Sequence, residues 1–274
     1  MTCIGVLDSG IGGLSVLREI QQLLPHENLL YVADQAHLPY GTRPLDEVRE
    51  FSEGITRFML AQNAKLVVIA CNTASAAALY DLRETFPDMP FVGMEPAVRP
   101  AARDTRTGII GVIATKATFQ GRLYASLIDR FANGLEVITR DCPELVLLAE
   151  RGMPYTESDY ADVSDLLADF REAHADQLVL GCTHFAFVKP LIAAAMGEDA
   201  AIIDPAPAVA QQVQRVLTQY DILNKSSQQE TISLLTTDDL STFKRQIENL
   251  PGDIQGEIAH LRWQDKTLDF DSAG

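Results

Sequence analysis

Short, uninterrupted runs of apolar residues alternate along this chain with longer segments whose apolar positions recur at helical spacing. The short runs lie at residues 4–7, 29–33, 66–70, 91–94, 108–113, 178–181 and 201–203. Strands without polar alternation are typical of a parallel sheet covered by helices on both faces. The helical segments lie at residues 14–24, 45–62, 74–85, 120–131, 160–174 and 206–220. The pattern predicts an α/β fold with doubly wound, mainly parallel sheets.

Two strand-and-turn units recur in the two halves of the chain. Residues 4–9 (IGVLDS) resemble residues 110–115 (IGVIAT), and residues 67–73 (VVIACNT) resemble residues 178–184 (LVLGCTH). We therefore expect two pseudo-symmetric lobes. Because the loops that follow parallel strands share one edge of a sheet, the active site is expected in the cleft between the lobes, with Cys71 and Cys182 on opposite sides.

Prolines near residues 96 and 205 mark two places where the chain could cross between the lobes. We expect residues 1–97 and 208–263 to form the first lobe, which carries Cys71. Residues 98–207 would form the second lobe, which carries Cys182. The polar residues 264–274 are expected to form a flexible tail.

Composition and charge exclude several classes of function for this chain. The chain has 274 residues, 47% of them hydrophobic, and a formal net charge of −16. Such a charge argues against binding to nucleic acid or to anionic membranes, which need clustered basic residues. The longest apolar-leaning run, residues 66–82, contains several polar residues, and the first residues lack an export signal. We expect a cytoplasmic protein without a membrane segment.

The four cysteines, Cys3, Cys71, Cys142 and Cys182, are far apart and form no C-x-x-C pair. No Cys/His cluster has the spacing of zinc ligands, so we expect no metal site. Disulfides are rare in a reducing cytosol. Each cysteine is therefore either core filler, as expected for Cys3 and Cys142, or a reactive thiol.

Cys71 and Cys182 each follow a buried strand, where a helix or turn begins. Backbone N–H groups at such a position favour an anion, so we expect the pKa of the Cys71 thiol to be lowered. Asn72 and Thr73 could cap this helix or bind a carboxylate, and His184 could orient Cys182 or control its proton. The alternative is a pair of buried cysteines with ordinary capping residues.

Two glycine-containing turns lie at the same sheet edge. Residues 8–13 (DSGIGG) lack the third glycine of a dinucleotide-binding loop, which is replaced by Ser15, although Asp34 could imitate the ribose-binding acid of such a site. We favour glycines that let the backbone approach a small ligand, with Asp8 facing an ammonium group or the proton-transfer centre. The Pro-Tyr-Gly turn at residues 39–41 could offer N–H groups to a second carboxylate, or be only a turn.

Together these motifs resemble the glutamate racemases of the cofactor-independent aspartate/glutamate racemase superfamily, over residues 3–263. The resemblance implies two-base racemisation without a cofactor, which supplies D-glutamate for peptidoglycan. Cys71 would take the α-proton from D-glutamate and Cys182 from L-glutamate, with Asp8 and His184 assisting. The implied substrate-binding positions are Asp8, Ser9, Tyr40, Gly41, Asn72, Thr73, Thr183 and His184. Glu150 would be a further acid near the site.

Three alternatives stay open at this stage. An aspartate racemase would use the same chemistry on a substrate shorter by one methylene. A non-catalytic amino-acid-binding module could also place two lobes around a cleft, although such modules are usually exported. A thiol redox protein could use Cys71 and Cys182 as a pair. The sequence also leaves open whether the chain is a monomer or a homodimer.

Overall fold

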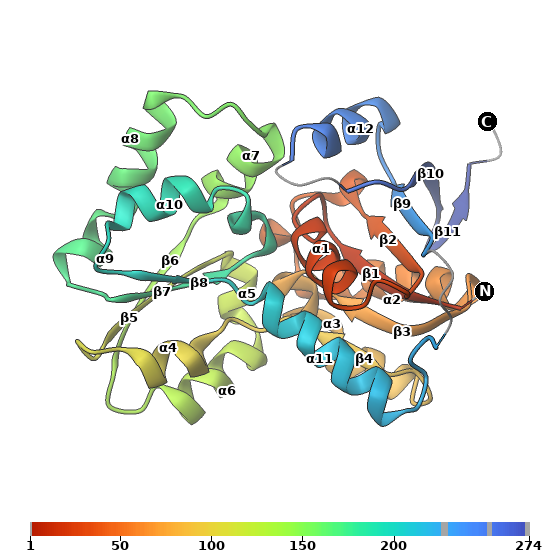
Figure 1. Cartoon of the computed structure of the whole chain (residues 1–274), viewed down its shortest axis with the longest axis horizontal. Helices are drawn as coiled ribbons and strands as arrows, with labels where there is room; N and C mark the ends of the chain where they lie inside the picture. The colour runs from red at the N-terminus through yellow and green to blue at the C-terminus, as the bar shows by residue number, and fades with distance from the viewer. Residues whose placement is uncertain (1, 226–229, 251–253, 272–274) are drawn as a thin grey trace.

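The computed structural model describes residues 2–225, 230–250 and 254–271. These residues form two sheets that lie side by side, each flanked by helices (Figure 1). The first sheet has seven strands in the order β11-β10-β9-β2-β1-β3-β4, and all its pairs are parallel except β10 with β11. Its strands are β1 (Cys3–Asp8), β2 (Leu29–Ala33), β3 (Ala64–Ile69), β4 (Phe91–Gly93), β9 (Ile232–Thr236), β10 (Glu257–Gln264) and β11 (Thr267–Phe270).

The second sheet is fully parallel, with four strands in the order β6-β5-β7-β8. Its strands are β5 (Ile109–Ala114), β6 (Glu136–Asp141), β7 (Gln177–Gly181) and β8 (Ala201–Ile203). The two sheets confirm the predicted α/β class with mainly parallel strands.

Helices connect the strands in both parts of the molecule (Figure 1). With the first sheet lie α1 (Leu14–Leu23), η1 (Gln35–His37), η2 (Tyr40–Thr42), α2 (Leu45–Ala61), α3 (Asn72–Thr85), α11 (Ala206–Gln219) and α12 (Leu240–Glu248). With the second lie α4 (Val98–Asp104), α5 (Lys116–Gln120), α6 (Arg122–Phe131), α7 (Pro143–Arg151), α8 (Glu157–Leu166), α9 (Ala168–Glu172), η3 (Thr183–Ala186) and α10 (Lys189–Met196). Among the described residues, no helix is both long and apolar enough to cross a membrane.

The central strand β1 explains why the apolar runs are continuous. All six of its residues are buried. Ile4 and Val6 belong to the core that contains α1 and α11, whereas Cys3 and Leu7 belong to the core that contains α2 and α3. Because side chains alternate between the two faces of a strand, a sheet with a core on each face requires apolar residues at every position.

Strand register places the chemistry-bearing turns at common edges. Asp8 pairs with Ala33, and Leu7 pairs with Ile69, so the turns after β1, β2 and β3 lie side by side. In the second sheet Ala114 pairs with Gly181, which puts Thr115 beside Cys182 at the corresponding edge. Parallel pairing therefore gathers the predicted site residues of each sheet at one edge.

The chain crosses to the second sheet after β4 and returns through α11, which packs against α1 before β9 and β10 extend the first sheet. The lobe boundaries at residues 97 and 208 stay a prediction. The segment 264–274, expected to be a flexible tail, differs from that expectation: Thr267–Phe270 pairs with β10. Leu268 explains the difference, because its buried side chain joins the core beside α2. Residues 272–274 lie outside the described residues.

Other elements also differ from the pattern. The helix expected at residues 160–174 is two helices, α8 and α9, which meet at Leu167. The strand β6 was not expected, and its burial pattern shows why: its residues are exposed or half-buried at the end of the second sheet. An edge strand of this kind lacks the continuous apolar run that marks a central one.

A buried ion pair of the first lobe binds the segment that follows α11. Lys65 Nζ lies 2.6 Å from Glu27 Oε2, and the Glu27 side chain is only 2% exposed. Lys65 also donates to the Ile222 carbonyl, and Glu27 accepts from the Asn224 N–H. We expect Lys65→Met to lower the free energy of unfolding by about 3–5 kcal/mol, because the carboxylate would stay buried without its cation. Urea denaturation measures this, and adding Glu27→Gln should restore much of the loss.

Candidate active site

The edges of the two sheets meet through direct contacts between predicted site residues. Thr183 Oγ1 donates to Asp8 Oδ1 at 3.2 Å, which joins the turn after β7 to the end of β1. A Cβ atom at Gly12 would lie 2.7 Å from His184 Nδ1, so the glycine lets the loop after β1 approach η3 closely. The close approach of this loop is made to the facing lobe, and its predicted approach to a small ligand stays a prediction.

Cys71 lies at the start of α3, as the sequence predicted, but Cys71 itself is the N-cap and not Asn72 or Thr73, which were expected to cap the helix. Its Sγ accepts a hydrogen bond from the Ala74 N–H at 3.4 Å and lies 4.0 Å from Ser9 Oγ. The predicted lowering of its pKa is wrong. Burial raises the pKa of the thiol, the nearby Asp8 carboxylate raises it further, and the Ala74 N–H only partly offsets them. The uncharged thiol is therefore the resting form of Cys71.

A negative charge on Cys182 also raises the pKa of Cys71. Contacts between their neighbours join the two thiols. Cys71 Sγ lies 4.0 Å from Ser9 Oγ, and Asp8, which precedes Ser9, accepts a hydrogen bond from Thr183, the residue that follows Cys182. Both side chains are buried, with Cys71 6% and Cys182 9% exposed. The structure therefore brings the two candidate thiols to one site, each at the end of a strand from a different sheet.

Asp8 is fully buried beneath the loop that follows β1. Its Oδ2 accepts hydrogen bonds from the backbone N–H groups of Gly10 and Gly13, at 3.2 and 3.0 Å. Burial raises the pKa of Asp8, and His184 and these two N–H groups oppose that effect. Asp8 is thus held in one orientation, with its second oxygen directed to Thr183.

Cys182, His184 and Glu150 form a hydrogen-bonded chain. Cys182 Sγ lies 3.7 Å from His184 Nδ1, and His184 Nε2 lies 2.6 Å from Glu150 Oε1. Burial alone would lower the pKa of His184, but hydrogen bonds to Cys182 and Glu150 outweigh it and raise the pKa well above the ordinary value. The imidazole is therefore poised to be protonated beside Cys182.

Glu150 belongs to α7 of the second lobe, but the first lobe supplies most of its hydrogen-bond donors. Oε1 accepts from the Ile11 N–H at 3.1 Å, and Oε2 accepts from Gln246 Nε2 of α12 at 2.7 Å. Burial raises the pKa of Glu150, but the hydrogen bond to His184, with further support from Ile11 and Gln246, lowers it overall. Gln246 was missed by the sequence analysis, because no motif connects a surface helix after β9 with residue 150.

Asn72 has a buried side-chain amide without hydrogen-bond partners in the described part of the chain. Its side chain is 2% exposed, yet neither Oδ1 nor Nδ2 has a hydrogen-bond partner among the described residues. A buried amide without partners costs free energy, so such groups are expected to meet a ligand or a water. Asn72 is the first residue of α3 and follows Cys71, which makes its amide a candidate for binding a ligand at this site.

Thr73 belongs to a cluster of three buried threonines that joins the lobes. Its Oγ1 lies 2.9 Å from Thr115 Oγ1, which lies 3.0 Å from Thr118 Oγ1. Gly41 lies against this cluster, since a Cβ there would be 2.6 Å from Thr115 Cβ. Thr115 and Thr118 were missed, although the internal repeat aligns Thr115 with Ser9 and contained the signal for the first of them.

Tyr40 is buried, and its hydroxyl donates to Asp34 Oδ2 at 2.6 Å. The hydroxyl hydrogen therefore bonds to Asp34 and is not available to a ligand. The donors that this turn can offer to a ligand are the backbone N–H groups of residues 40–41. Asp34 serves this turn through its side chain, which does not favour the ribose-binding alternative.

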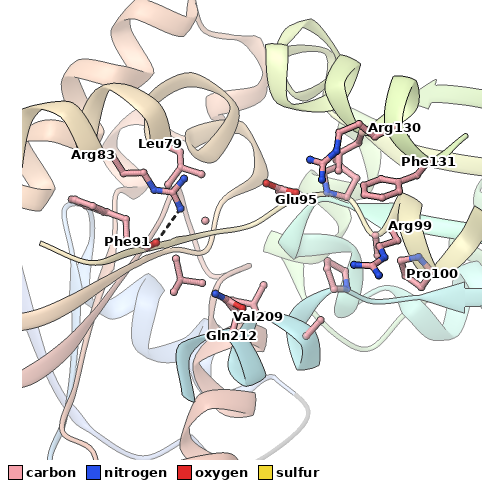
Figure 2. Close-up of a pocket in the computed structure, with 17 residues that line it drawn as sticks. Leu79, Arg83, Phe91, Glu95, Arg99, Pro100, Arg130, Phe131, Val209 and Gln212 are labelled. Atoms are coloured by element: carbon pink, nitrogen blue, oxygen red, sulfur yellow. Dashed lines mark hydrogen bonds between the residues drawn. The ribbon is translucent and has the colours of Figure 1, made fainter. Parts of the chain in front are cut away.

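A different hollow, with a volume of about 420 Å³, lies where the chain crosses between the lobes. Figure 2 shows that Arg83, Arg99, Arg130 and Glu95 line it, with Phe131 beneath two of the guanidinium groups. None of the predicted site residues belongs to its lining. Within residues 2–225, 230–250 and 254–271, no group of three or more His, Cys, Asp or Glu side chains could hold a metal ion.

Comparison with known proteins identifies a family that matches this chain. The model of the family described as Asp/Glu/Hydantoin racemase matches residues 4–213. The chain belongs to this family. It is 50% identical to the glutamate racemase of Pseudomonas putida (strain F1) over 222 residues, which are 81% of this chain and 84% of the relative.

Solved structures from the family have the same fold. Glutamate racemase RacE1 from Bacillus anthracis is 31% identical, with a TM-score of 0.84 over 97% of this chain and 98% of that one. The Francisella tularensis glutamate racemase, solved in complex with D-glutamate, is 28% identical, with a TM-score of 0.79 over 97% of this chain and 98% of that one. The chain is thus an amino-acid racemase of this family, as the motif resemblance predicted.

Proposed function

We propose that this chain is a glutamate racemase that interconverts L- and D-glutamate by proton transfer between Cys71 and Cys182. The observation that carries the proposal is the pair of buried thiols at the ends of β3 and β7, which are joined through the contacts of Ser9, Asp8 and Thr183. The names of the similar proteins support glutamate as the substrate.

In the proposed reaction the α-carbon of glutamate lies between the two sulfurs. One thiolate takes the α-hydrogen as a proton and becomes a thiol, and the electron pair of the C–H bond stays on the substrate as a carbanion. The opposite thiol then gives its proton to the other face of that carbon and becomes a thiolate. The products are the other enantiomer and a site with the two protonation states exchanged, so no external base or oxidant is consumed.

The environment of Cys71 explains how a resting thiol can act as a base. Burial and the Asp8 carboxylate raise the pKa of Cys71. The α-ammonium of glutamate would bring a positive charge beside Asp8 and Cys71, which favours the thiolate. Formation of the base would therefore be coupled to binding of the substrate. On the other face, the protonated His184 would stabilise the Cys182 thiolate.

Binding of the two substrate carboxylates falls to the polar groups around the thiols. We assign the unpartnered amide of Asn72 and the hydroxyl of Ser9 to the α-carboxylate region, where hydrogen bonds stabilise the carbanion. Thr183 supports this region by holding Asp8 through its hydroxyl. We also assign to substrate binding the cluster of Thr73, Thr115 and Thr118 and the backbone N–H groups of residues 40–41, because they too are polar groups around the thiols. Burial of these groups excludes water and strengthens each interaction.

We further propose that the enzyme acts in the cytoplasm and supplies D-glutamate for peptidoglycan. All four cysteines are free and buried, which suits a reducing compartment. Both thiols must also stay reduced for the proposed chemistry.

Incubation of the purified enzyme with L-glutamate in deuterated water tests the proposal. Loss of circular dichroism with one deuterium at the α-carbon is expected, after extensive dialysis against chelator and without pyridoxal phosphate. Faster turnover of L-aspartate would change the substrate assignment to aspartate. Neither exchange nor racemisation with either amino acid, in reduced and folded protein, would refute the proposed function and favour a binding module.

A further inference from the structure

The side chain of Asp34 is a junction between the substrate-binding turn and the C-terminal strands. Asp34 follows β2 and is fully buried. Its Oδ2 accepts hydrogen bonds from Tyr40 Oη at 2.6 Å and from His37 Nδ1 at 2.9 Å. Its Oδ1 accepts from Thr237 Oγ1 at 2.8 Å and from Trp263 Nε1 at 2.7 Å. Four donors from three parts of the chain therefore converge on one carboxylate.

The two oxygens of the Asp34 carboxylate bind donors from different segments of the first lobe. Oδ2 holds Tyr40, whose turn places Gly41 against Thr115 of the second lobe. Oδ1 holds the residue after β9 and a residue of β10, both more than 200 positions away along the chain. Because the Tyr40 hydroxyl donates its hydrogen bond to Asp34, the position of the 39–42 turn depends on this carboxylate.

The aromatic surroundings restrict the junction further. The His37 ring stacks on Phe51 of α2 with centroids 3.8 Å apart, and Trp263 lies edge-on to His37 at 5.3 Å. A Cβ at Gly54 would lie 2.8 Å from the Trp263 ring, so the indole packs directly against the backbone of α2. Trp263 is the single tryptophan of the sequence, so its fluorescence reports on this junction alone.

We propose that Asp34 is a positioning residue that acts through Tyr40 to set the substrate-binding turn, and that Trp263 and Thr237 hold Asp34 in place for this role. The inference rests on the proposed function, because it assumes that residues 40–41 contact glutamate. Asp34 itself touches neither the thiols nor the substrate. Its effect is on how well the turn is organised before glutamate arrives.

Asp34→Asn tests the proposal, because an amide offers one acceptor oxygen where the carboxylate offers two. An asparagine can satisfy either the Tyr40 side or the Trp263 side as the carboxylate does, but not both. We expect KM for glutamate to rise about 10- to 100-fold with a smaller change in kcat, since the turn contributes to binding in the ground state and the transition state alike.

Tyr40→Phe and the double variant separate positioning from general loss of stability. If Asp34 acts through Tyr40, Tyr40→Phe should also raise KM, and Asp34→Asn with Tyr40→Phe should be about as defective as either single change. Glu27→Gln is the matched control, because it also alters a buried carboxylate of the first lobe with several donors, but lies outside the site. It should lower the denaturation midpoint and leave KM unchanged.

The fluorescence of Trp263 provides a readout independent of turnover. Titration with D-glutamate should change the emission of the wild-type enzyme, and Asp34→Asn should remove most of that response. Independent, additive effects of the two single changes on KM, or an unchanged KM in folded Asp34→Asn, would overturn the proposal. If the wild-type enzyme racemises nothing, the proposed function fails, whereas a glutamate-dependent emission change that needs Asp34 would still support the junction.

Discussion

Replacing Cys182 with serine is expected to lower racemisation by at least about 10³-fold and yet leave exchange of the α-hydrogen of D-glutamate with solvent. A serine hydroxyl is a far weaker acid than a thiol and cannot deliver a proton to the carbanion at a useful rate. Cys71 can still remove the proton from D-glutamate and return a solvent deuteron to the same face. Mass spectrometry of the α-position, combined with chiral analysis, separates exchange with retention from racemisation.

The complementary change sharpens the test. Cys71→Ser should also abolish racemisation, and any residual exchange should occur with L-glutamate instead of D-glutamate. Cys142→Ser is the matched control, since Cys142 is a buried free thiol whose Sγ donates to the Arg140 carbonyl at 3.7 Å. It should keep activity close to wild type. Undiminished racemisation in either Cys71→Ser or Cys182→Ser would refute the two-thiol scheme.

The second large effect is expected for Glu150→Gln, which removes the charge that faces His184. The Glu150 carboxylate helps to raise the pKa of His184, so the neutral amide should lower that pKa. The imidazolium would then lose its proton at a lower pH, and the Cys182 thiolate would lose its cation. We expect kcat/KM at pH 8 to fall about 10- to 100-fold, and the alkaline limb of its pH profile to move to lower pH.

Two comparisons make this prediction specific. Glu144→Gln removes an exposed carboxylate from the first turn of the same helix, α7, and should change neither kcat/KM nor its pH profile. The His184 ring can be followed directly by its NMR titration. A Glu150→Gln enzyme with reduced activity but an unmoved alkaline limb would show that Glu150 acts by holding the lobes together through Gln246 and Ile11.

The strands that carry the site were predictable because they are buried on both faces. Residues 29–33 and 178–181 were expected as strands and form β2 (Leu29–Ala33) and β7 (Gln177–Gly181), and every residue of both strands is buried. Strands at the margins, such as β6, were missed because partial exposure weakens the apolar signal. The Cys71 and Cys182 positions followed from the repeat, which marks the ends of equivalent strands in the two sheets.

Features that depend on burial and on distant residues were not predictable. The sequence suggested a lowered pKa for Cys71 from its place at a helix start, but burial and Asp8 raise it. A local motif cannot report how much water surrounds a thiol, and the desolvation of a charge outweighs one N–H group. Thr118, Gln246 and the two distant donors of Asp34, Thr237 and Trp263, were likewise absent from any motif.

The sequence by itself determined the α/β class, the internal repeat and the family, because apolar runs and turn motifs are local properties of the chain. Only the tertiary structure decided the protonation of the site, since a pKa depends on every charge and on the solvent within several ångströms. The tertiary structure also decided that first-lobe residues hold Glu150 and that Asp34 receives Trp263. Those contacts join positions far apart in sequence. The contacts of Glu150 depend on how the two sheets lie together, and the contact of Trp263 with Asp34 depends on the strand order of the first sheet.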